Sequence, residues 1–398
     1  MTTNARVTEV MRASYGRLLA ILASRTGDIL AAEDALSDAF AKALIHWPKE
    51  SPKNPEAWLL TVARNRLIDI KRRDARVEYR DEVSGLAQPD AAPKDLPDDR
   101  LKLMFVCAHP AIDARIHTPL MLQTVLGLRA EVIAQAYLLP SSTMAKRLVR
   151  AKKKIRDAGV AFQVPEEAEL SSRLAAVLEA IYGAFSRDWL GEDTLAEEAF
   201  YLASLLADLM PDRAEVLGLA ALIAYTLSRK DARVQGGEFV PLEDQDTAKW
   251  DRDLMLRAGA YLTRAKAQKG FGRFQLEAAI QAVHADRAST GATDWNALVH
   301  LHYGLSHVAP TIGASVGFAA SLGKAVGPED GLNTLYQIDE NVRAAFGPAE
   351  ATRAYLLSEL GKTHEAAAAY ERAISLTVEP PLRRYLEAKR AGLRDRLA

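Results

Sequence analysis

Two stretches of the chain carry residue types that could perform catalysis or hold a metal ion. Residues 313–317, GASVG, match the G-x-S-x-G nucleophile elbow of hydrolases, which needs a strand before the serine and a helix after it. The Ala- and Gly-rich surroundings instead indicate a helix, in which small residues let helices cross closely. His300, His302 and His307 cluster locally, but no cysteine or acidic residue completes a metal-ligand spacing. We therefore expect no catalytic residue, no bound metal and no cofactor.

Polyanion binding is the chemistry that the residues support best. Residues 141–156, SSTMAKRLVRAKKKIR, contain seven Lys or Arg side chains. Met144, Leu148, Ala151 and Ile155 recur at spacings of four, three and four, which predicts a helix with one buried face. The opposite face would then expose Ser142, Ala145, Lys146, Val149, Lys152 and Lys153. This pattern favours a packed helix over a basic tail.

A second, shorter helix precedes this basic helix. Ile133, Ala134 and Tyr137 give it an amphipathic pattern, and residues 138–140, LLP, must turn the chain. Ser141 or Ser142 is then expected to cap the following helix. Two helices joined by a tight turn, the second one basic outside and apolar inside, are typical of a helix-turn-helix that reads duplex DNA.

A third candidate surface belongs to a helix that begins at Asn54 and Pro55, a natural N-cap and a natural first helical residue. Its buried face is predicted to comprise Leu59, Ala63, Leu67 and Ile70. Its other side would show Trp58, Thr61, Arg64, Asn65, Asp69, Arg72 and Arg73. An aromatic ring beside basic and amide groups suits phosphates and unstacked bases, although a solvated charged face explains the same residues equally well.

An earlier helix is predicted by Asp28, which can act as its N-cap. The apolar stripe of this helix is Ile29, Ala32, Leu36, Phe40 and Leu44. The stripe predicts that this side of the helix packs in a core.

Composition bounds the class of protein. The 398 residues are 49% hydrophobic and 26% charged, as in ordinary globular proteins, and no apolar run is long enough to span a membrane. The one cysteine excludes an intrachain disulfide, which fits the cytoplasm. Residues 1–160 hold 26 basic and 19 acidic side chains, whereas the remainder holds 25 basic and 33 acidic ones. The first part therefore suits a polyanion partner and the second part does not.

The periodicity predicts an all-α protein, because apolar residues repeat at helical spacing and no sustained alternation occurs. Residues 81–97, DEVSGLAQPDAAPKDLP, are polar and proline-bearing, which is typical of a flexible linker. We expect domains at 1–80, 98–160 and 166–398, the last of them entirely helical.

These stretches together resemble extracytoplasmic-function sigma factors of the sigma-70 family. The motifs AEDALSDAFAKAL, NPEAWLLTVARNRLIDIKRR and LLPSSTMAKRLVRAKKKI are similar to regions 2 and 4 of that family. MPDRAEVLGLAALI, PLEDQDTAKWDRDLM, FQLEAAIQAVHA and TDWNAL resemble the subgroup with a long helical, tetratricopeptide-like C-terminal extension. The resemblance covers nearly the whole chain. It implies an alternative sigma factor, which binds core RNA polymerase and directs initiation at promoters but catalyses no reaction itself.

The resemblance also implies roles for particular residues. Core RNA polymerase would be bound by Asp34, Ser37, Asp38 and Phe40, where many members have Gln in place of Ser37. The −10 promoter element would be bound and melted by the loop 46–53 and by Trp58, Arg64, Asn65, Asp69, Arg72 and Arg73. The −35 element would be bound by Ser142, Thr143, Lys146, Arg147, Arg150 and Lys153. Lys154 and Arg156 would add general attraction to phosphates.

The C-terminal extension has a repeat pattern of its own. Ala354, Leu357, Gly361, Ala366, Tyr370 and Ala373 follow the tetratricopeptide helix-turn-helix spacing. Such arrays bind peptides or partner helices, so we expect the acidic extension to contact the sigma domains or polymerase and to regulate activity. A packed helical domain without a partner is the alternative.

Two other classes of protein share some of these features. A one-component transcriptional regulator with a helical sensor domain would share the helix-turn-helix, but it has no need of the helix that carries Trp58. A helical-repeat scaffold with an incidental basic helix would show no salt-dependent affinity for DNA.

Overall fold

The computed structural model describes residues 3–49, 52–77, 99–137, 139–187, 195–268 and 271–394. The expected linker, 81–97, lies outside these residues. Within them the predicted all-α fold is confirmed, with one small hairpin of strands β1 (Val234–Gln235) and β2 (Glu238–Phe239). No helix in the described part of the chain is long and apolar enough to cross a membrane. The chain divides into two compact units, Met1–Arg187 and Asp188–Ala398, here called the N-terminal and C-terminal units.

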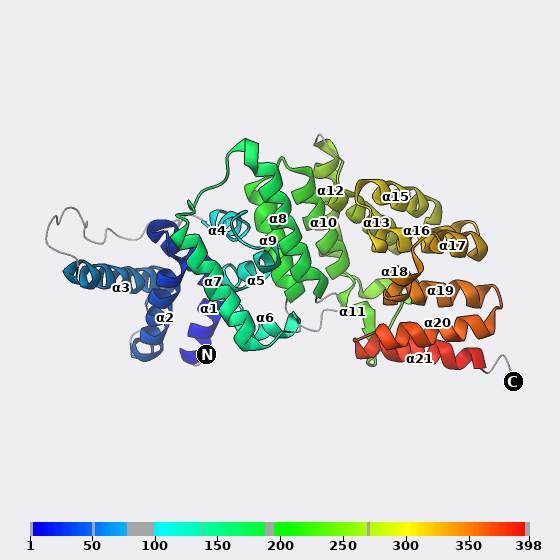
Figure 1. Cartoon of the computed structure of the whole chain (residues 1–398), viewed down its shortest axis with the longest axis horizontal. Coiled ribbons are helices and arrows are strands. Elements are labelled where there is room, and N and C mark those ends of the chain that lie inside the picture. The colour runs from blue at the N-terminus through cyan, green and yellow to red at the C-terminus, as the bar shows by residue number, and fades with distance from the viewer. Residues whose placement is uncertain are drawn as a thin grey trace. The chain divides into compact units, whose positions relative to one another are not determined.

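The N-terminal unit contains eight helices among its described residues (Figure 1). They are α1 (Thr3–Thr26), α2 (Ile29–His46), α3 (Pro55–Val77), α4 (Arg100–Cys107), α5 (Ala114–Thr124), α6 (Ala130–Ala136), α7 (Ser141–Asp157) and α8 (Glu167–Arg187).

Two of the predicted helix starts are confirmed by hydrogen bonds. The carboxylate of Asp28 accepts the backbone N–H of Leu30 at 2.9 Å, and α2 begins at the next residue, Ile29. The amide oxygen of Asn54 accepts the backbone N–H of Ala57 at 3.1 Å, and Pro55 opens α3. These caps satisfy donors that the first turn of a helix leaves without a partner.

Helix α1 joins the two halves of the N-terminal unit, since it contacts α2 and α3 as well as α4 and α5. Gly16 makes this packing close. A Cβ atom at Gly16 would lie 1.8 Å from the carbonyl oxygen of Val125, just beyond α5. Gly127, in the turn that follows, has a φ of 71°, which glycine adopts without strain. The segments expected as separate domains 1–80 and 98–160 therefore share one compact unit.

Helix α8 also belongs to the N-terminal unit, although the expected boundary near residue 166 would assign it to the third domain. It packs against α4 and α5 and buries an apolar stripe that includes Leu174, Val177 and Ile181. At one point the Arg173 guanidinium donates to the backbone oxygen of Phe105 at 2.5 Å. The apolar face of α8 is thus covered by α4 and α5. The break between the two units falls after Arg187, at the end of α8.

The C-terminal unit is a succession of packed helices. Its described helices, besides two short 3-10 turns at Leu242–Asp244 and Thr247–Lys249, are α9 (Leu195–Leu209), α10 (Ala214–Leu227), α11 (Lys230–Arg233), α12 (Arg252–Ala267), α13 (Arg273–Ala285), α14 (Arg287–Thr290), α15 (Trp295–Val308), α16 (Ile312–Ala325), α17 (Pro328–Leu335), α18 (Glu340–Ala344), α19 (Gly347–Glu359), α20 (Thr363–Leu376) and α21 (Pro380–Arg394).

The last three helices, α19 to α21, pack in sequence, side by side (Figure 1). Ala354 and Leu357 of α19 share a buried cluster with Ala366, Tyr370 and Ala373 of α20, as the repeat pattern predicts. The turn between them is at Gly361, whose φ is 71°. The helical hairpin is thus formed by the residues that the spacing singled out.

The GASVG stretch lies wholly inside α16, so the strand that a nucleophile elbow requires is missing at this position. The Ser315 hydroxyl donates to the backbone oxygen of Thr311 at 3.3 Å. A Cβ atom at Gly317 would lie 2.4 Å from the His302 ring. Gly317 therefore allows the close approach of α16 to His302 of α15, as expected for a small residue at a helix crossing.

Candidate nucleic-acid interface

One side of α3 forms an exposed polar surface. Thr61, Asn65, Asp69 and Arg72 are exposed, and Trp58 is half-buried on the same side. The opposite side buries Leu59, Leu60, Ala63 and Leu67, with Ile70 half-buried at its edge. The predicted division of this helix into a packed face and a polar face is therefore confirmed.

The aromatic end of this surface is held by a second tryptophan. Trp47, which is 2% exposed, meets Trp58 edge to face with ring centroids 5.7 Å apart. The ring of His46 is also near, with its centroid 6.3 Å from that of Trp58. Edge-to-face packing fixes the Trp58 ring while part of the ring remains available to a base.

Two of the arginines predicted for this surface differ from the rest. Arg64 lies on the flank of α3, half-buried, and its Nε has no hydrogen-bond partner among the described residues. Burial, together with the nearby charge of Arg25, lowers the pKa of the Arg64 guanidinium. The side chain of Arg73 lies outside the described residues.

The residues that the resemblance assigns to polymerase binding divide into exposed and buried ones. Asp34 and Ser37 are exposed on α2, and the Asp38 carboxylate pairs with Arg66 of α3 at 2.7 Å. Phe40, however, is 5% exposed, because it forms part of the packed face of α2. Little of the Phe40 side chain is therefore presented at the surface of α2.

The last turns of α2 depart from the predicted apolar stripe. Leu44 is 46% exposed and Ile45 is 65% exposed, so the prediction that Leu44 packs inward is wrong. Ala43 and Trp47 fill the core at this end instead. The exposed pair lies on the same helix as Asp34 and Ser37. The spacing had assigned Leu44, but not Ile45, to the core.

A second candidate surface is formed by α6 and α7, two helices joined by a short turn. Ile133 and Ala134 are buried, Tyr137 is half-buried, and the Leu139 N–H donates to the Ala134 carbonyl at 2.9 Å across the turn. Leu138 lies outside the described residues. The buried face of α7 comprises Met144, Leu148, Ala151 and Ile155, as predicted.

The start of α7 differs from the prediction. Pro140 occupies the N-cap position, Ser141 is already helical, and no side chain caps the helix. The Pro140 carbonyl instead accepts the N–H groups of Thr143 at 2.9 Å and Met144 at 3.1 Å. Because proline already has the backbone geometry needed before a helix, the serine hydroxyls stay exposed and available to a ligand.

The open side of α7 presents the residues expected to contact DNA. Ser142, Lys146, Arg147, Arg150 and Lys153 are exposed, and Thr143 is half-buried. Helix α7 thus offers hydroxyl and cationic donors on a side free of its own core, an arrangement that suits the major groove and its flanking phosphates.

Lys152 is the exception on this helix. It was expected on the open face, but its side chain is 3% exposed and its ammonium lies 2.5 Å from the carboxylate of Glu33 on α2. Burial raises the pKa of the Glu33 carboxyl, although the Lys152 charge acts in the opposite direction. Burial and the charge of Glu33 also raise the pKa of Tyr15 on α1. Lys152 therefore joins α7 to α2 and is unavailable to a nucleic acid.

A second, weaker ion pair follows the first. Arg156, one turn further along α7, lies 3.8 Å from the carboxylate of Asp28, the cap of α2. Two residues in the C-terminal half of α7, Lys152 and Arg156, therefore tie this helix to α2. The exposed hydroxyls lie in its first turn, and exposed cations occur along its whole length.

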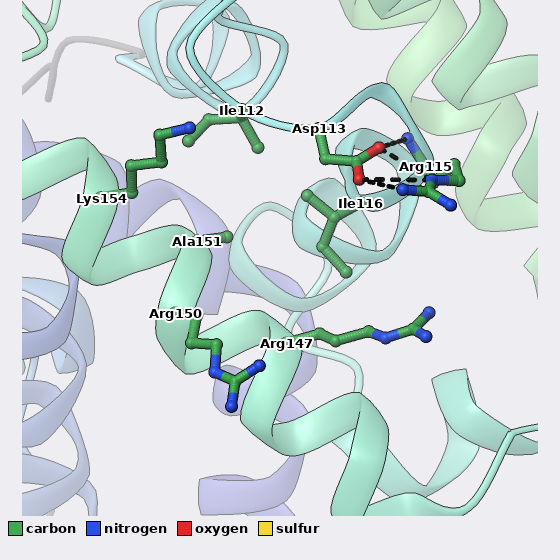
Figure 2. Close-up of a pocket in the computed structure, with 8 residues that line it drawn as sticks. All are labelled: Ile112, Asp113, Arg115, Ile116, Arg147, Arg150, Ala151 and Lys154. Atoms are coloured by element: carbon green, nitrogen blue, oxygen red, sulfur yellow. Dashed lines mark hydrogen bonds and ion pairs between the residues drawn. The ribbon is translucent and has the colours of Figure 1, made fainter.

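A cationic cavity lies between α7 and the start of α5. Its volume is about 290 Å³, and Figure 2 shows the residues that line it: Ile112, Asp113, Arg115, Ile116, Arg147, Arg150, Ala151 and Lys154. Asp113 caps α5 and pairs with Arg115 at 2.7 Å, and these hydrogen bonds lower the pKa of Asp113 to about 2. The cavity is therefore positive, with its carboxylate already paired.

Comparisons with known proteins agree with parts of this picture. The model of sigma-70 region 2 matches residues 10–77, which span most of α1 and all of α2 and α3. A family of unknown function, DUF6596, matches residues 173–266, from within α8 to the end of α12. An uncharacterized protein of Rhizobium meliloti (strain 1021) is 34% identical over 363 residues, which are 87% of this chain and 86% of the relative. No solved structure matches the chain.

Proposed function

We propose, on the premise that this chain belongs to the sigma-70 family and to one family with its Rhizobium meliloti relative, that it is an alternative sigma factor of the extracytoplasmic-function type. The observation that carries the proposal is the match of sigma-70 region 2 to α1–α3, the helices that build the polar face with Trp58. A region 2 domain binds core RNA polymerase and promoter DNA. The polymerase then performs the chemistry.

In this proposal the exposed face of α3 captures the −10 element. Trp58 offers a ring fixed by Trp47 for stacking on an unpaired base. Asn65, Asp69 and Arg72 follow it along one exposed side, so they suit base edges and the backbone of a melted strand. Arg64 lies on the flank of this row, and Arg73 is retained as a proposed contact from the resemblance.

Helix α7 serves as the −35 reader. Its proposed contacts with duplex DNA are Ser142, Thr143, Lys146, Arg147, Arg150 and Lys153. All of them except the half-buried Thr143 are exposed, which supports this assignment. Phosphates position such a helix and base edges give it specificity. Polymerase binding is assigned to Asp34, Ser37 and Asp38 of α2, with Phe40 as the packed residue beneath them.

The deciding experiment is run-off transcription with core polymerase on the gene's own upstream region. A transcript that requires the chain supports the proposal, and the absence of any transcript contradicts it. Asn65→Ala should lower the yield on a closed duplex and much less on a template pre-opened over the −10 element, because the melted strand is then supplied. Equal loss on both templates would contradict the −10 assignment.

The C-terminal extension is proposed to regulate this activity through contacts with the sigma domains or polymerase. The excess of acidic over basic residues beyond residue 160, opposite to the excess before it, supports such contacts. Deleting residues 188–398 should change promoter output or polymerase affinity. Unchanged values for both would contradict a regulatory role.

A one-component regulator is the second candidate, and the helix-turn-helix of α6 and α7 is the observation that favours it. Such a protein would bind duplex DNA as a dimer without polymerase. Tight, sequence-specific binding by the chain alone, with no polymerase-dependent transcript, would support this candidate over a sigma factor.

A further inference from the structure

Three arginines of the C-terminal unit lie close together around one segment. Arg229 lies between α10 and α11, Arg233 is the last residue of α11, and Arg287 is the first residue of α14. Helices α11 and α14 both contact the turn at residues 247–249, which precedes Trp250. We call the three arginines the arginine cluster.

Arg229 is a buried cation held by a neutral partner. It is 4% exposed, and its Nη2 donates to the side-chain oxygen of Gln281 on α13. Its Nη1 is also buried and has no hydrogen-bond partner among the described residues, none of whose carboxylates pairs with Arg229. Burial, together with the charges of Arg233 and Arg287, lowers the pKa of Arg229 to about 9. Since buried charges in proteins are normally paired, a ligand that suits Arg229 has to be an anion.

Arg287 is likewise held by neutral groups. It donates three hydrogen bonds, each of 2.8 Å, to backbone oxygens of residues 242–245. The carboxylate of Glu243 in this segment is paired with Lys324 of α16 at 2.8 Å. The charge of Arg287 therefore adds to that of Arg229.

Trp250 supplies a second donor beside these cations. It is 3% exposed, and its ring centroid lies 5.9 Å from the guanidinium carbon of Arg229 and 5.1 Å from that of Arg287. Its Nε1, which can only donate, is buried and has no hydrogen-bond partner within the described part of the chain. The positive field extends to His284 on α13, whose pKa is lowered to about 3 by burial and then by the charge of Arg229. Two buried donors and two cations together favour an acceptor with negative charge.

We propose that the arginine cluster binds a small inorganic anion, with the Nη1 of Arg229 and the Nε1 of Trp250 as donors to it. A water molecule would accept these hydrogen bonds but leave the charges of Arg229 and Arg287 unpaired, whereas an anion satisfies both requirements. The anion joins the segment 240–251, which carries Trp250, to α13 and α14. This site is independent of the promoter function proposed above, and it makes the stability of the C-terminal unit depend on the anions in solution.

The test measures thermal unfolding of the full chain while sodium chloride or sodium phosphate replaces sodium gluconate, a salt of a bulky anion, at constant ionic strength. The variant is Arg229→Met. Arg252→Met, at an exposed arginine of the same unit, is the matched control. Hydrogen exchange of peptides from residues 240–251 reports the C-terminal unit separately.

The wild type and Arg252→Met should respond alike. An anion at ten times its dissociation constant should lower the unfolding equilibrium constant of the C-terminal unit about 11-fold, which raises its melting temperature by about 3–6 °C. Exchange in residues 240–251 should slow by a similar factor. Both effects should saturate with anion concentration and be absent in Arg229→Met. A response to chloride alone supports a halide site, and a response to phosphate as well supports an oxyanion site.

An equal response of the wild type and Arg229→Met overturns the proposal, because general effects of salt on stability act on both. Crystals of the wild-type chain, one set grown with bromide and one with phosphate, give an answer even if Arg229→Met does not fold. Anomalous scattering from bromide, or density for a phosphate, beside the Nη1 of Arg229 supports the site. Water alone at this position in both sets overturns it.

Discussion

The buried pair between Lys152 and Glu33 gives the sharpest test of the N-terminal unit. Lys152→Met removes the ammonium and keeps the length of the side chain. It leaves the Glu33 carboxylate, which is 16% exposed, beside α7 without its cation. We expect this variant to lose about 3–5 kcal/mol of the free energy of unfolding of the N-terminal unit, the usual cost of breaking a buried ion pair.

The magnitude follows from two opposing effects. At 2.5 Å and an effective dielectric constant of about 20, the attraction between the two charges is ~7 kcal/mol. Removing each ion from water costs several kcal/mol. The two effects nearly cancel in the native pair, whereas the variant keeps the cost of the buried carboxylate and loses the attraction.

The double variant Lys152→Met with Glu33→Met should therefore recover the loss and can exceed the wild-type stability, because hydrophobic replacement of a buried pair is neutral or stabilising. Lys153→Met, on the next and exposed residue of α7, is the matched control. It should stay within about 0.5 kcal/mol of the wild type.

The stability loss in Lys152→Met should also depend on pH. The pKa of Glu33 is already raised by burial, and removal of Lys152 should raise it further. When the pKa of a carboxyl is higher in the folded than in the unfolded protein, its burial lowers the stability at neutral pH. This loss of stability disappears as the pH falls below the pKa that the same carboxyl has in the unfolded chain. The loss in Lys152→Met should therefore be smaller near pH 5 than at pH 7.

The free energy of unfolding is measured by urea unfolding of the full chain. Hydrogen exchange of peptides from α2 and α7 then reports the unfolding of the N-terminal unit separately. If Lys152→Met were no more destabilising than Lys153→Met, or if its loss did not shrink on acidification, the pair would not be buried as described. The reasoning about α7 and α2 would then be refuted.

Three further predictions concern other parts of the chain. Because α8 belongs to the N-terminal unit, a fragment 1–187 should unfold cooperatively in urea, whereas 1–165 should not, and similar transitions in both would contradict the boundary. Burial lowers the pKa of His302 to about 4, so the unfolded chain takes up a proton first as the pH falls below about 6.5, and stability should fall by up to ~1.4 kcal/mol per pH unit. His302→Gln should show a flatter dependence in unfolding at pH 5 and 7, and an equal dependence would refute this. Lys146→Ala should change promoter preference, while Lys154→Ala should mainly lower the salt slope of DNA binding, and identical behaviour of the two would contradict the division of α7.

Local signals in the sequence predicted the parts of the interface that depend on neighbours along the chain. The caps at Asp28 and Asn54 and the packed face of α7 follow from hydrogen bonds and spacings within one or two helical turns. They were confirmed because no contact with a distant segment changes these local features in the structure. The prediction that Ser141 or Ser142 caps α7 was wrong, because Pro140 occupies the N-cap position and already provides the required backbone geometry.

Contacts between distant segments decided the rest. Spacing places Lys152 on the open side of its helix, and only the carboxylate of Glu33, 119 residues earlier, makes its burial tolerable. Phe40 and Leu44 belong to one periodic stripe, yet Trp47 fills the core in place of Leu44.

The sequence by itself determined the helices, their apolar faces and the residues able to meet a polyanion, because these depend on backbone hydrogen bonding and side-chain period. The tertiary structure decided which of those faces stay open. It also assigned α8 to the N-terminal unit, where Arg187 of α8 and Arg147 of α7 line one cavity. Which helix covers a given face depends on packing between segments far apart in the chain, and no local pattern contains that information.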